Sequence, residues 1–350
     1  MAQVSSPKEQ SDLNEIDALF RDAGLVRRRR GKALRPKEDR LDRAAPDELL
    51  VPAPEPTIAA NGVEWLPVPE WQKLSWLWAG FSTRRGGESR VYCGEGASPE
   101  LNLGFTAEDS REIVLRNRRL LAETVTGDAG TPLITVRQFH SNLVVRVGRD
   151  DASRDRPRKA DGLMTDEPGL LLGVQTADCT PVLVADRKRR AVAAFHAGWR
   201  GTVKRIVELG VGRMRIEFGS RPEDLTAAVG PGIGCCCYAV GEEVLSEFES
   251  QFVYARGLFH EVFDSDAVRT KYPMLFLTQR APGHSPIGPS LHLDVAEANR
   301  RQLLDAGLKP RAIRMMGGCT NCEGDLFFSH RGSHGRAGRM LSVIGMRPRG

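Results

Sequence analysis

The strongest constraint on the fold is the stretch 169–201, which contains three short apolar runs in close succession. Residues 170–176, 181–186 and 191–196 each have the length of a strand and are flanked by polar or turn-forming residues, which favours buried β-strands. The charged residues 187–190 separate the last two runs, and loops of this length are common in hairpins. The sequence therefore predicts a buried β-hairpin over residues 181–196.

A regular closure of this hairpin fixes its register. Pro181 then lies opposite His196, and Cys179 lies opposite Gly198. Side chains alternate along a strand, so His196 and Gly198 share a face, and a diagonal neighbour on that face is within reach. We therefore expect the Cys179 thiol and the His196 imidazole to converge at the open end of the hairpin. A register slip of one residue would separate them.

The composition is that of a globular protein, with 41% hydrophobic and 27% charged residues in 350. No apolar run approaches the roughly 20 residues of a membrane helix, and the first residues lack the apolar core of a secretion signal. We therefore expect a cytoplasmic protein without a membrane partner, whose seven cysteines are reduced thiols. The net charge of +5 is consistent with attraction for phosphate but predicts no nucleic-acid partner.

The charge and proline content divides the chain into two parts. Residues 1–60 predict a mostly disordered charged extension, whose basic run over 27–37 is interpreted as solvated rather than as a dock for nucleic acid or anionic lipid. Residues 61–350 predict one folded domain. Its expected helices are 110–126, 202–218, 242–252 and 293–306, and its further expected strands are 133–139, 143–147 and 225–229.

Several polar residues lie at turns between these elements. Arg84 precedes a Gly-Gly pair and Arg200 lies at a strand-to-helix junction, both of which suit an anion. His140 falls in a turn between two strands and is unremarkable by itself. The trio Cys235, Cys236 and Cys237 lacks regular ligand spacing and is interpreted as structural, and the Cys319/Cys322 pair is at best a moderate zinc or redox signal.

Six ordered sequence blocks resemble the laccase-domain, or polyphenol-oxidase-like, family, over residues 63–346. They are QFHSN, ADGLMT, GVQTADCTPVLVAD, FHAGWRGT, GPGIGCCCYAVG and FFSHR followed by AGR. Members of this family have also been described as purine nucleoside phosphorylases and as peptidoglycan-editing factors. The resemblance implies an α+β fold of packed mixed β-sheets flanked by helices, similar to a bacterial toxin deamidase.

The resemblance also implies a zinc ion held by His140, Cys179 and His196, with copper as the other possible metal. Three protein ligands leave an open position, which is the pattern of catalytic rather than structural zinc. The implied chemistry is phosphorolysis of adenosine, inosine and methylthioadenosine, with adenosine deamination alongside.

Further site residues follow from these blocks. We expect phosphate at Arg84, Arg200 or Arg331, substrate contact or acid/base chemistry at Asp161, and acid/base catalysis at Asp178; either carboxylate could equally cap a turn. His330, Gly232 and Ala337 stand where the family usually has tyrosine, serine and threonine, which leaves the preferred nucleoside open.

Two alternatives belong to other reaction classes. A copper-type polyphenol oxidase is disfavoured because laccase chemistry needs many histidines, and this chain has seven with no His-x-His pair. A cysteine hydrolase acting in peptidoglycan editing would use Cys179 as nucleophile, which conflicts with its use as a metal ligand. Oligomeric state is not predicted from the sequence.

Overall fold

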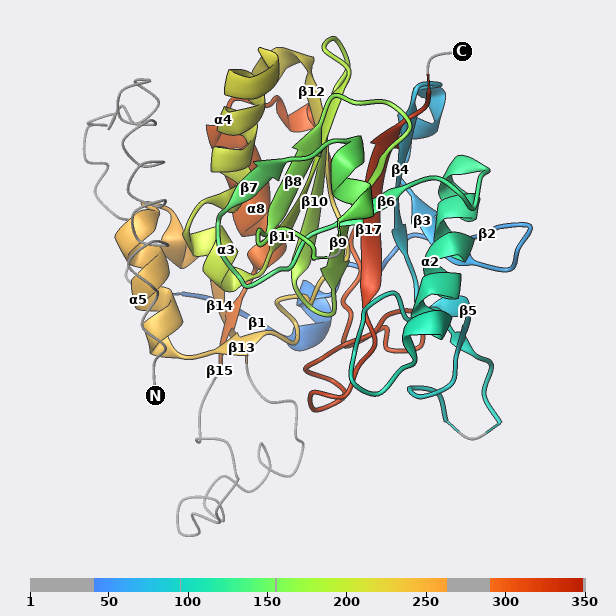
Figure 1. Cartoon of the computed structure of the whole chain (residues 1–350). Helices are drawn as coiled ribbons and strands as arrows, with labels where there is room; N and C mark the ends of the chain where they lie inside the picture. Colours follow the sequence, from blue (N-terminus) through green and yellow to red (C-terminus); the bar gives the residue numbers. More distant parts are fainter. Residues whose placement is uncertain (1–40, 95, 155, 263–289, 349–350) are drawn as a thin grey trace. The chain divides into compact units, whose positions relative to one another are not determined.

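The computed structural model of the chain describes residues 41–94, 96–154, 156–262 and 290–348 (Figure 1). In these residues two six-stranded β-sheets pack face to face, and helices cover their outer faces. This arrangement confirms the predicted mixed α+β class.

The first sheet has the strand order β16-β12-β10-β11-β8-β7. Its strands are β7 (Val144–Arg146), β8 (Gly162–Thr165), β10 (Thr180–Asp186), β11 (Ala191–Ala197), β12 (Leu225–Val229) and β16 (Ile313–Met315). The second sheet has the order β2-β3-β4-β17-β9-β6. Its strands are β2 (Thr57–Ile58), β3 (Glu64–Pro67), β4 (Leu77–Ser82), β6 (Leu133–Thr135), β9 (Leu171–Thr176) and β17 (Met340–Met346).

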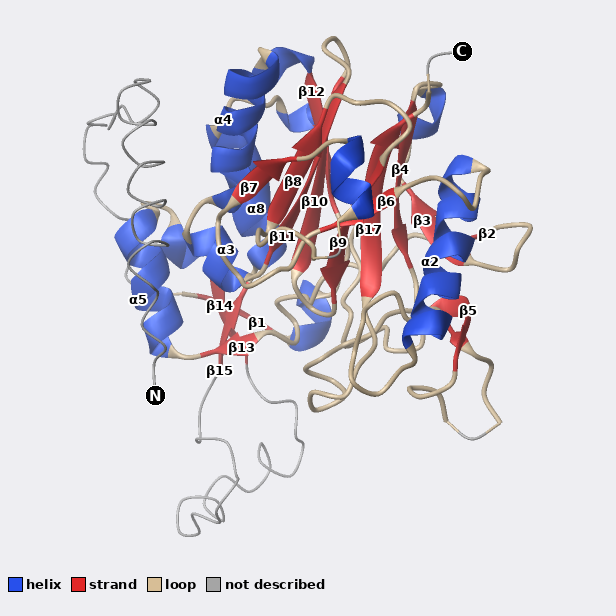
Figure 2. Cartoon of the chain, in the orientation of Figure 1, coloured by secondary structure: helices blue, strands red, loops and turns tan. Residues whose placement is uncertain are grey.

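A smaller sheet lies beside these two, with the order β1-β14-β15-β13. It contains β1 (Asp42–Ala44), β13 (Ala239–Val240), β14 (Phe259–Val262) and β15 (Ser290–Leu293), while β5 (Arg85–Ser89) is joined only by isolated bridges to Glu100. The described helices are α2 (Arg111–Thr126), α3 (Trp199–Val203), α4 (Ile206–Phe218), α5 (Glu242–Gln251) and α8 (Val295–Asp305) (Figure 2). Helix α5 packs on the small sheet through Phe248 and Phe259.

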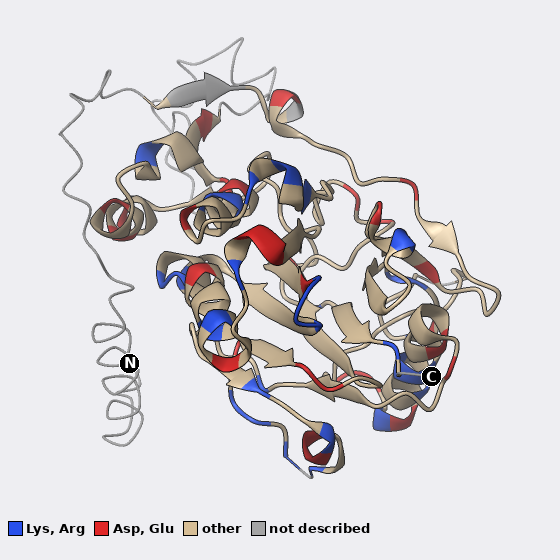
Figure 3. Cartoon of the chain, turned by 90° about the horizontal axis from the view of Figure 1, so that it is seen from above, with Lys and Arg blue, Asp and Glu red and all other residues tan. Residues whose placement is uncertain are grey.

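The hydrophobic core explains the layers. On β10, Leu183 and Ala185 face the second sheet, whereas Val182 and Val184 face helices α4 and α8. Both sets are fully buried, which explains why apolar residues follow one another along this strand without alternating polar ones. Helix α2 covers the far face of the second sheet. Charged residues therefore gather on helices and loops, while the central strands carry few of them (Figure 3).

The predicted hairpin and its register are confirmed. Strands β10 and β11 are antiparallel, and Pro181 is paired with His196. This register places Cys179, which directly precedes β10, next to the end of β11 that carries His196.

Three expectations differ from the structure. The helix expected over 202–218 is two helices, α3 and α4, because Arg205 adopts a left-handed backbone with φ of 61°. The strand expected over 133–139 ends at Thr135, since the following residues turn toward the site. Residues 41–60, expected within the extension, contain β1, β2 and a short 3₁₀ helix over Pro46–Leu49, and the apolar residues of this stretch, including Leu49 and Leu50, pack on the domain. Residues 1–40 lie outside the described residues.

Among the described helices, none combines the length and apolarity needed to cross a membrane.

Candidate metal centre

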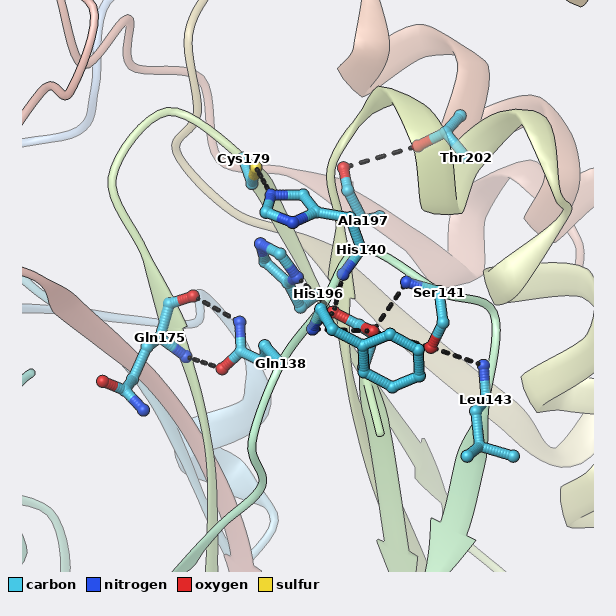
Figure 4. Close-up of polar contacts among 11 residues, drawn as sticks. Gln138, His140, Ser141, Leu143, Gln175, Cys179, His196, Ala197 and Thr202 are labelled. Carbon is cyan, nitrogen blue, oxygen red and sulfur yellow. Dashed lines mark hydrogen bonds and ion pairs between the residues drawn. The ribbon is translucent and has the colours of Figure 1, made fainter. Parts of the chain in front are cut away.

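Two loops meet at the open end of the β10–β11 hairpin. Cys179 precedes β10, His196 lies near the end of β11, and His140 lies on the loop that follows β6. The Cys179 Sγ lies 3.8 Å from His140 Nε2, and the ligand atoms of all three residues lie within 4.8 Å of one another. The two imidazole rings are 5.1 Å apart between centroids (Figure 4). The structure thus brings together the three side chains that the resemblance identified.

Asp161, which directly precedes β8, organises this arrangement. Its side chain has no exposed surface, and it accepts hydrogen bonds from five donor atoms. They are the backbone N–H groups of Phe139, His140 and Ser141, the Ser141 hydroxyl and the His196 Nδ1–H. One carboxylate therefore holds both the turn that carries His140 and the ring of His196.

The hydrogen bond to Asp161 also fixes the His196 tautomer. Burial favours a raised pKa for Asp161, but the bonds from His196 and Ser141 outweigh it, so the pKa lies below its ordinary value. The ionised carboxylate has no proton to give, and His196 Nδ1 must be the donor at 2.8 Å. This leaves Nε2 of His196 as the metal-facing atom, the arrangement usual for histidine ligands.

The thiol and the buried imidazole form a coupled pair. Burial would raise the pKa of Cys179, but the positive charge of His196 and the hydrogen bonds from both histidines lower it to about 6. Burial would likewise lower the pKa of His196, and Cys179 and Asp161 instead raise it to about 9. At neutral pH the metal-free pair is a thiolate beside an imidazolium, so Cys179 already has the charge state that a metal requires.

The backbone around the triad is strained and closely packed. His140 has φ of 62° and Asp178 has φ of 89°, values that residues other than glycine rarely adopt. Two hydrogen bonds between Gln138 and the backbone of Gln175 fasten the His140 loop to β9 (Figure 4). A methyl group at Gly198 would lie 2.7 Å from Cys179 Sγ and 3.2 Å from His140 Cδ2. Only glycine leaves room for these two side chains to meet.

The donor set fits a divalent metal. Tetrahedral zinc with bonds of about 2.0–2.3 Å holds its nitrogen and sulfur ligands roughly 3.3–3.8 Å apart, close to the separations in the triad. His196 and Asp161 are buried, whereas His140 is exposed, so the centre is open to solvent on the His140 side. Three ligands with one open side would leave a position for a reactant.

Asp178 joins the centre to the C-terminal loop, which is the segment between β16 and β17. Its carboxylate accepts hydrogen bonds from the Thr320 hydroxyl at 2.7 Å, the Ser329 hydroxyl at 2.7 Å and the Arg331 backbone N–H at 2.6 Å. Both oxygens are therefore engaged. These three contacts match the turn-capping role expected as the alternative to acid/base catalysis.

The three arginines differ in their surroundings. Arg84 is paired with Glu100 at 2.5 Å, hydrogen-bonds to the Gly324 carbonyl and lies over the Phe328 ring. Arg200 and Arg331 are exposed. The Arg200 guanidinium stacks on Trp199, whereas that of Arg331 lies 5.3 Å from the Tyr238 ring centroid. Arg84 is thus paired with a carboxylate, whereas the Arg331 guanidinium donates, among the described residues, a single hydrogen bond, to the Ala239 carbonyl at 3.2 Å.

Tyr238 is a site residue that the sequence reasoning missed. Burial raises its pKa to about 12, the charge of Cys179 adds to this shift, and Arg331 and Arg200 oppose it. Tyr238 therefore lies within electrostatic range of Cys179 and of both exposed arginines. The only signal in the sequence was its place directly after the cysteine trio.

We predict that Gly198→Ala disrupts the triad without unfolding the domain. Gly198 has φ of −67°, which alanine adopts easily, so the added methyl acts only by displacing the Cys179 thiol. We expect metal affinity to fall by more than about 10-fold, as for loss of an orienting contact. Metal titration and thermal melting check this, with Gly94→Ala, where a methyl meets nothing within 4 Å, as the control. Unchanged metal affinity would contradict the packing argument.

Comparison with known proteins identifies close relatives of this chain. The family model described as "Multi-copper polyphenol oxidoreductase laccase" matches residues 78–347. A protein of Geobacillus stearothermophilus named purine nucleoside phosphorylase YlmD is 35% identical over 281 residues, which cover 77% of this chain and 90% of the relative. A protein of an unknown prokaryotic organism named adenosine deaminase RL5 is 31% identical over 270 residues, 75% of this chain and 92% of the relative.

The fold also matches solved structures. The crystal structure of the Bacillus licheniformis hypothetical protein YfiH superposes with a TM-score of 0.67 at 32% sequence identity. The match covers 83% of this chain and 99% of that protein.

Proposed function

Because the chain belongs to the multi-copper polyphenol oxidoreductase laccase family, we propose that it is a zinc-dependent purine nucleoside phosphorylase. The substrates are adenosine, inosine and methylthioadenosine with phosphate, and adenosine deamination is a side activity, in line with the names of its relatives. One observation carries the proposal: the ligand atoms of His140, Cys179 and His196 lie within 4.8 Å of one another, and the charges of Cys179, Arg200 and Arg331 all act on the pKa of Tyr238.

His140, Cys179 and His196 would hold the metal through Nε2, Sγ and Nε2. When bound, zinc supplies a Lewis acid that polarises the base, the phosphate or a water molecule. Asp161 is a positioning residue that keeps the His196 ring and the His140 turn in place.

The arginines bind the phosphate. Arg200 and Arg331 present exposed guanidinium groups, whose planar donors match the geometry of phosphate oxygens, and Arg331 Nη1 also donates a hydrogen bond to the Ala239 carbonyl at 3.2 Å. A phosphate oxygen attacks C1′ of the nucleoside, the bond from C1′ to the purine nitrogen breaks, and its electron pair leaves with the base. Holding both reactants in line supplies much of the rate enhancement.

Tyr238 assists the departing base. Its hydroxyl is protonated at neutral pH, as that of any tyrosine is, so it can donate a hydrogen bond to the purine as negative charge develops there. Asp178 acts by holding Arg331 and the C-terminal loop, since its oxygens are engaged in that contact.

The alternatives differ in what they need from the same residues. Copper suits a ligand set of two histidines and one cysteine as well as zinc does. Oxidation of phenols by several coppers is not favoured, because the described residues contain one other candidate metal group, which consists of four cysteines. A hydrolase with Cys179 as nucleophile would have to work without metal at the triad.

The test is incubation of metal-loaded protein with adenosine, with and without phosphate, followed by separation of the products. Adenine and ribose 1-phosphate formed only with phosphate support phosphorolysis. Inosine alone identifies a deaminase. Oxygen uptake with a phenol would favour the copper oxidase. Absence of turnover would contradict the phosphorylase and favour a purely structural role for the metal.

We predict that Arg331→Ala raises the KM for phosphate by about 10-fold or more, because a hydrogen bond to a charged group contributes about 1.5–3 kcal/mol. The backbone N–H that binds Asp178 remains in this variant, so the loop stays in place. Initial rates at varied phosphate check the prediction. Arg187→Ala, at the opposite end of the hairpin, is the control. An unchanged KM would remove Arg331 from the phosphate site.

Two further expectations stay predictions. They are the likeness of the fold to a bacterial toxin deamidase and the cytoplasmic location without nucleic-acid or membrane partners.

A further inference from the structure

Four cysteines that the proposed reaction does not use form a second cluster. They are Cys236, Cys237, Cys319 and Cys322, and their sulfur atoms all lie within 4.8 Å of one another. Cys322 Sγ lies 3.3 Å from Cys237 Sγ and 3.6 Å from Cys236 Sγ. All four are free thiols.

The sheet topology explains why these residues meet. Strands β12 and β16 are parallel neighbours, with Val229 paired to Met315. Their carboxyl ends therefore lie at the same edge of the sheet, and the loops that follow start side by side. A bridge between Gly232 and Cys319 continues the pairing beyond the strands. Segments about 85 positions apart in sequence are thus fixed next to each other.

Each loop folds so that its two thiols point inward. In the first, the N–H groups of Cys237 and Tyr238 both bond to the Gly234 carbonyl at 2.9 Å, which forms a tight turn. In the second, the Glu323 carboxylate accepts the Cys319 N–H at 2.8 Å, while the Glu323 N–H bonds back to the Cys319 carbonyl. Both turns are held by bonds independent of the sulfur atoms.

The surroundings of the sulfur atoms suit thiolates. The Gly234 N–H points at Cys319 Sγ at 3.3 Å, and the Asn321 amide nitrogen lies 3.2 Å from Cys237 Sγ. Such donors neutralise part of the charge on metal-bound sulfur. A methyl at Gly234 would lie 3.0 Å from Cys236 Sγ, so this glycine lets the backbone approach the cluster.

We propose that Cys236, Cys237, Cys319 and Cys322 bind a second zinc ion as four thiolates in a closed, structural site. Zinc–sulfur bonds of about 2.3 Å in a tetrahedron place the sulfur atoms roughly 3.8 Å apart, within the spread of this cluster. Cys322 is exposed and Cys237 is half-buried, which gives the ion a path from solvent. Four protein ligands leave no position for a reactant.

The site fastens the loops that form one wall of the metal centre. Tyr238 follows Cys237 directly, and Thr320 follows Cys319 and hydrogen-bonds to Asp178 beside Cys179. Zinc at the four cysteines ties these two residues to the same point of the sheet edge.

The test counts zinc in the full-length protein after metal removal and reloading with zinc under reducing conditions. We expect about two zinc ions per chain, and about one in Cys237→Ser/Cys322→Ser. The triad variant His140→Ala/Cys179→Ser also binds about one, and X-ray absorption at the zinc edge of this variant shows four sulfur ligands at about 2.3 Å. Cys235→Ser, in the same trio but outside the cluster, keeps both ions.

The outcomes separate this proposal from that for the triad. Zinc that survives the Cys237→Ser/Cys322→Ser change undiminished, or nitrogen and oxygen ligands in the triad variant, overturns the four-cysteine site. If the triad variant loses zinc and the Cys237→Ser/Cys322→Ser variant does not, the four-cysteine site is wrong and the proposed function is unaffected. Because the triad variant keeps all four cysteines, its zinc content decides the question even where the cluster variant does not fold.

Discussion

Cys179→Ser is expected to remove one zinc ion per chain and to lower turnover of adenosine by more than about 100-fold. Losing a group that merely orients a ligand costs about 10–100-fold in affinity or activity, so losing the ligand itself costs more. The thiol pKa of about 6 provides a thiolate at neutral pH, whereas a serine hydroxyl stays protonated and has no charge to offer. Zinc analysis and kcat/KM on the same preparation check both effects.

Cys93→Ser is the matched control for this change. Cys93 is a free thiol outside both cysteine-containing metal groups, and its sulfur contacts only the Arg90 carbonyl among the interactions described. We expect its zinc content and turnover to equal those of the unchanged protein. A Cys179→Ser protein that turns over adenosine without zinc would refute the metal mechanism.

Asp161→Asn is expected to have the second largest effect, because in the proposed mechanism Asp161 positions two of the metal ligands. An amide of the same shape keeps one acceptor oxygen and places an NH₂ group among five donor atoms. We expect zinc affinity at the triad to fall by about 10–100-fold. Stability falls by about 3 kcal/mol or more, because a buried, charged network loses its centre. Competitive zinc titration and urea unfolding of the metal-free protein measure the two effects.

Asp186→Asn separates the positioning role from general burial. Asp186 is also fully buried and caps the turn at the other end of the hairpin through the N–H groups of Lys188 and Arg189. We expect this variant to lose stability and to bind zinc normally. Equal zinc affinities for Asp161→Asn and Asp186→Asn would show that Asp161 has no special part in the centre.

The hairpin was predictable because its information is local. Two apolar runs and a short charged loop determine β10, β11 and the pairing of Pro181 with His196. The helix break at Arg205 was not predictable, since the apolar pattern continues across it and only the left-handed backbone ends α3.

The rest of the site depends on contacts between distant segments. His140 was an ordinary turn residue until the family resemblance singled it out, and its position follows from the bonds of Asp161 to residues 139–141. The four-cysteine cluster could not be predicted from the spacing of cysteines in the sequence. Two of its members are adjacent, and its two halves meet only through the parallel pairing of β12 with β16.

The most direct test of the metal centre is anomalous diffraction at the zinc edge from crystals of the zinc-loaded protein. We expect a peak at the open end of the β10–β11 hairpin, about 2.0–2.1 Å from the Nε2 atoms of His140 and His196 and about 2.3 Å from Cys179 Sγ. A fully loaded crystal with no peak between these three atoms would contradict the proposed metal centre.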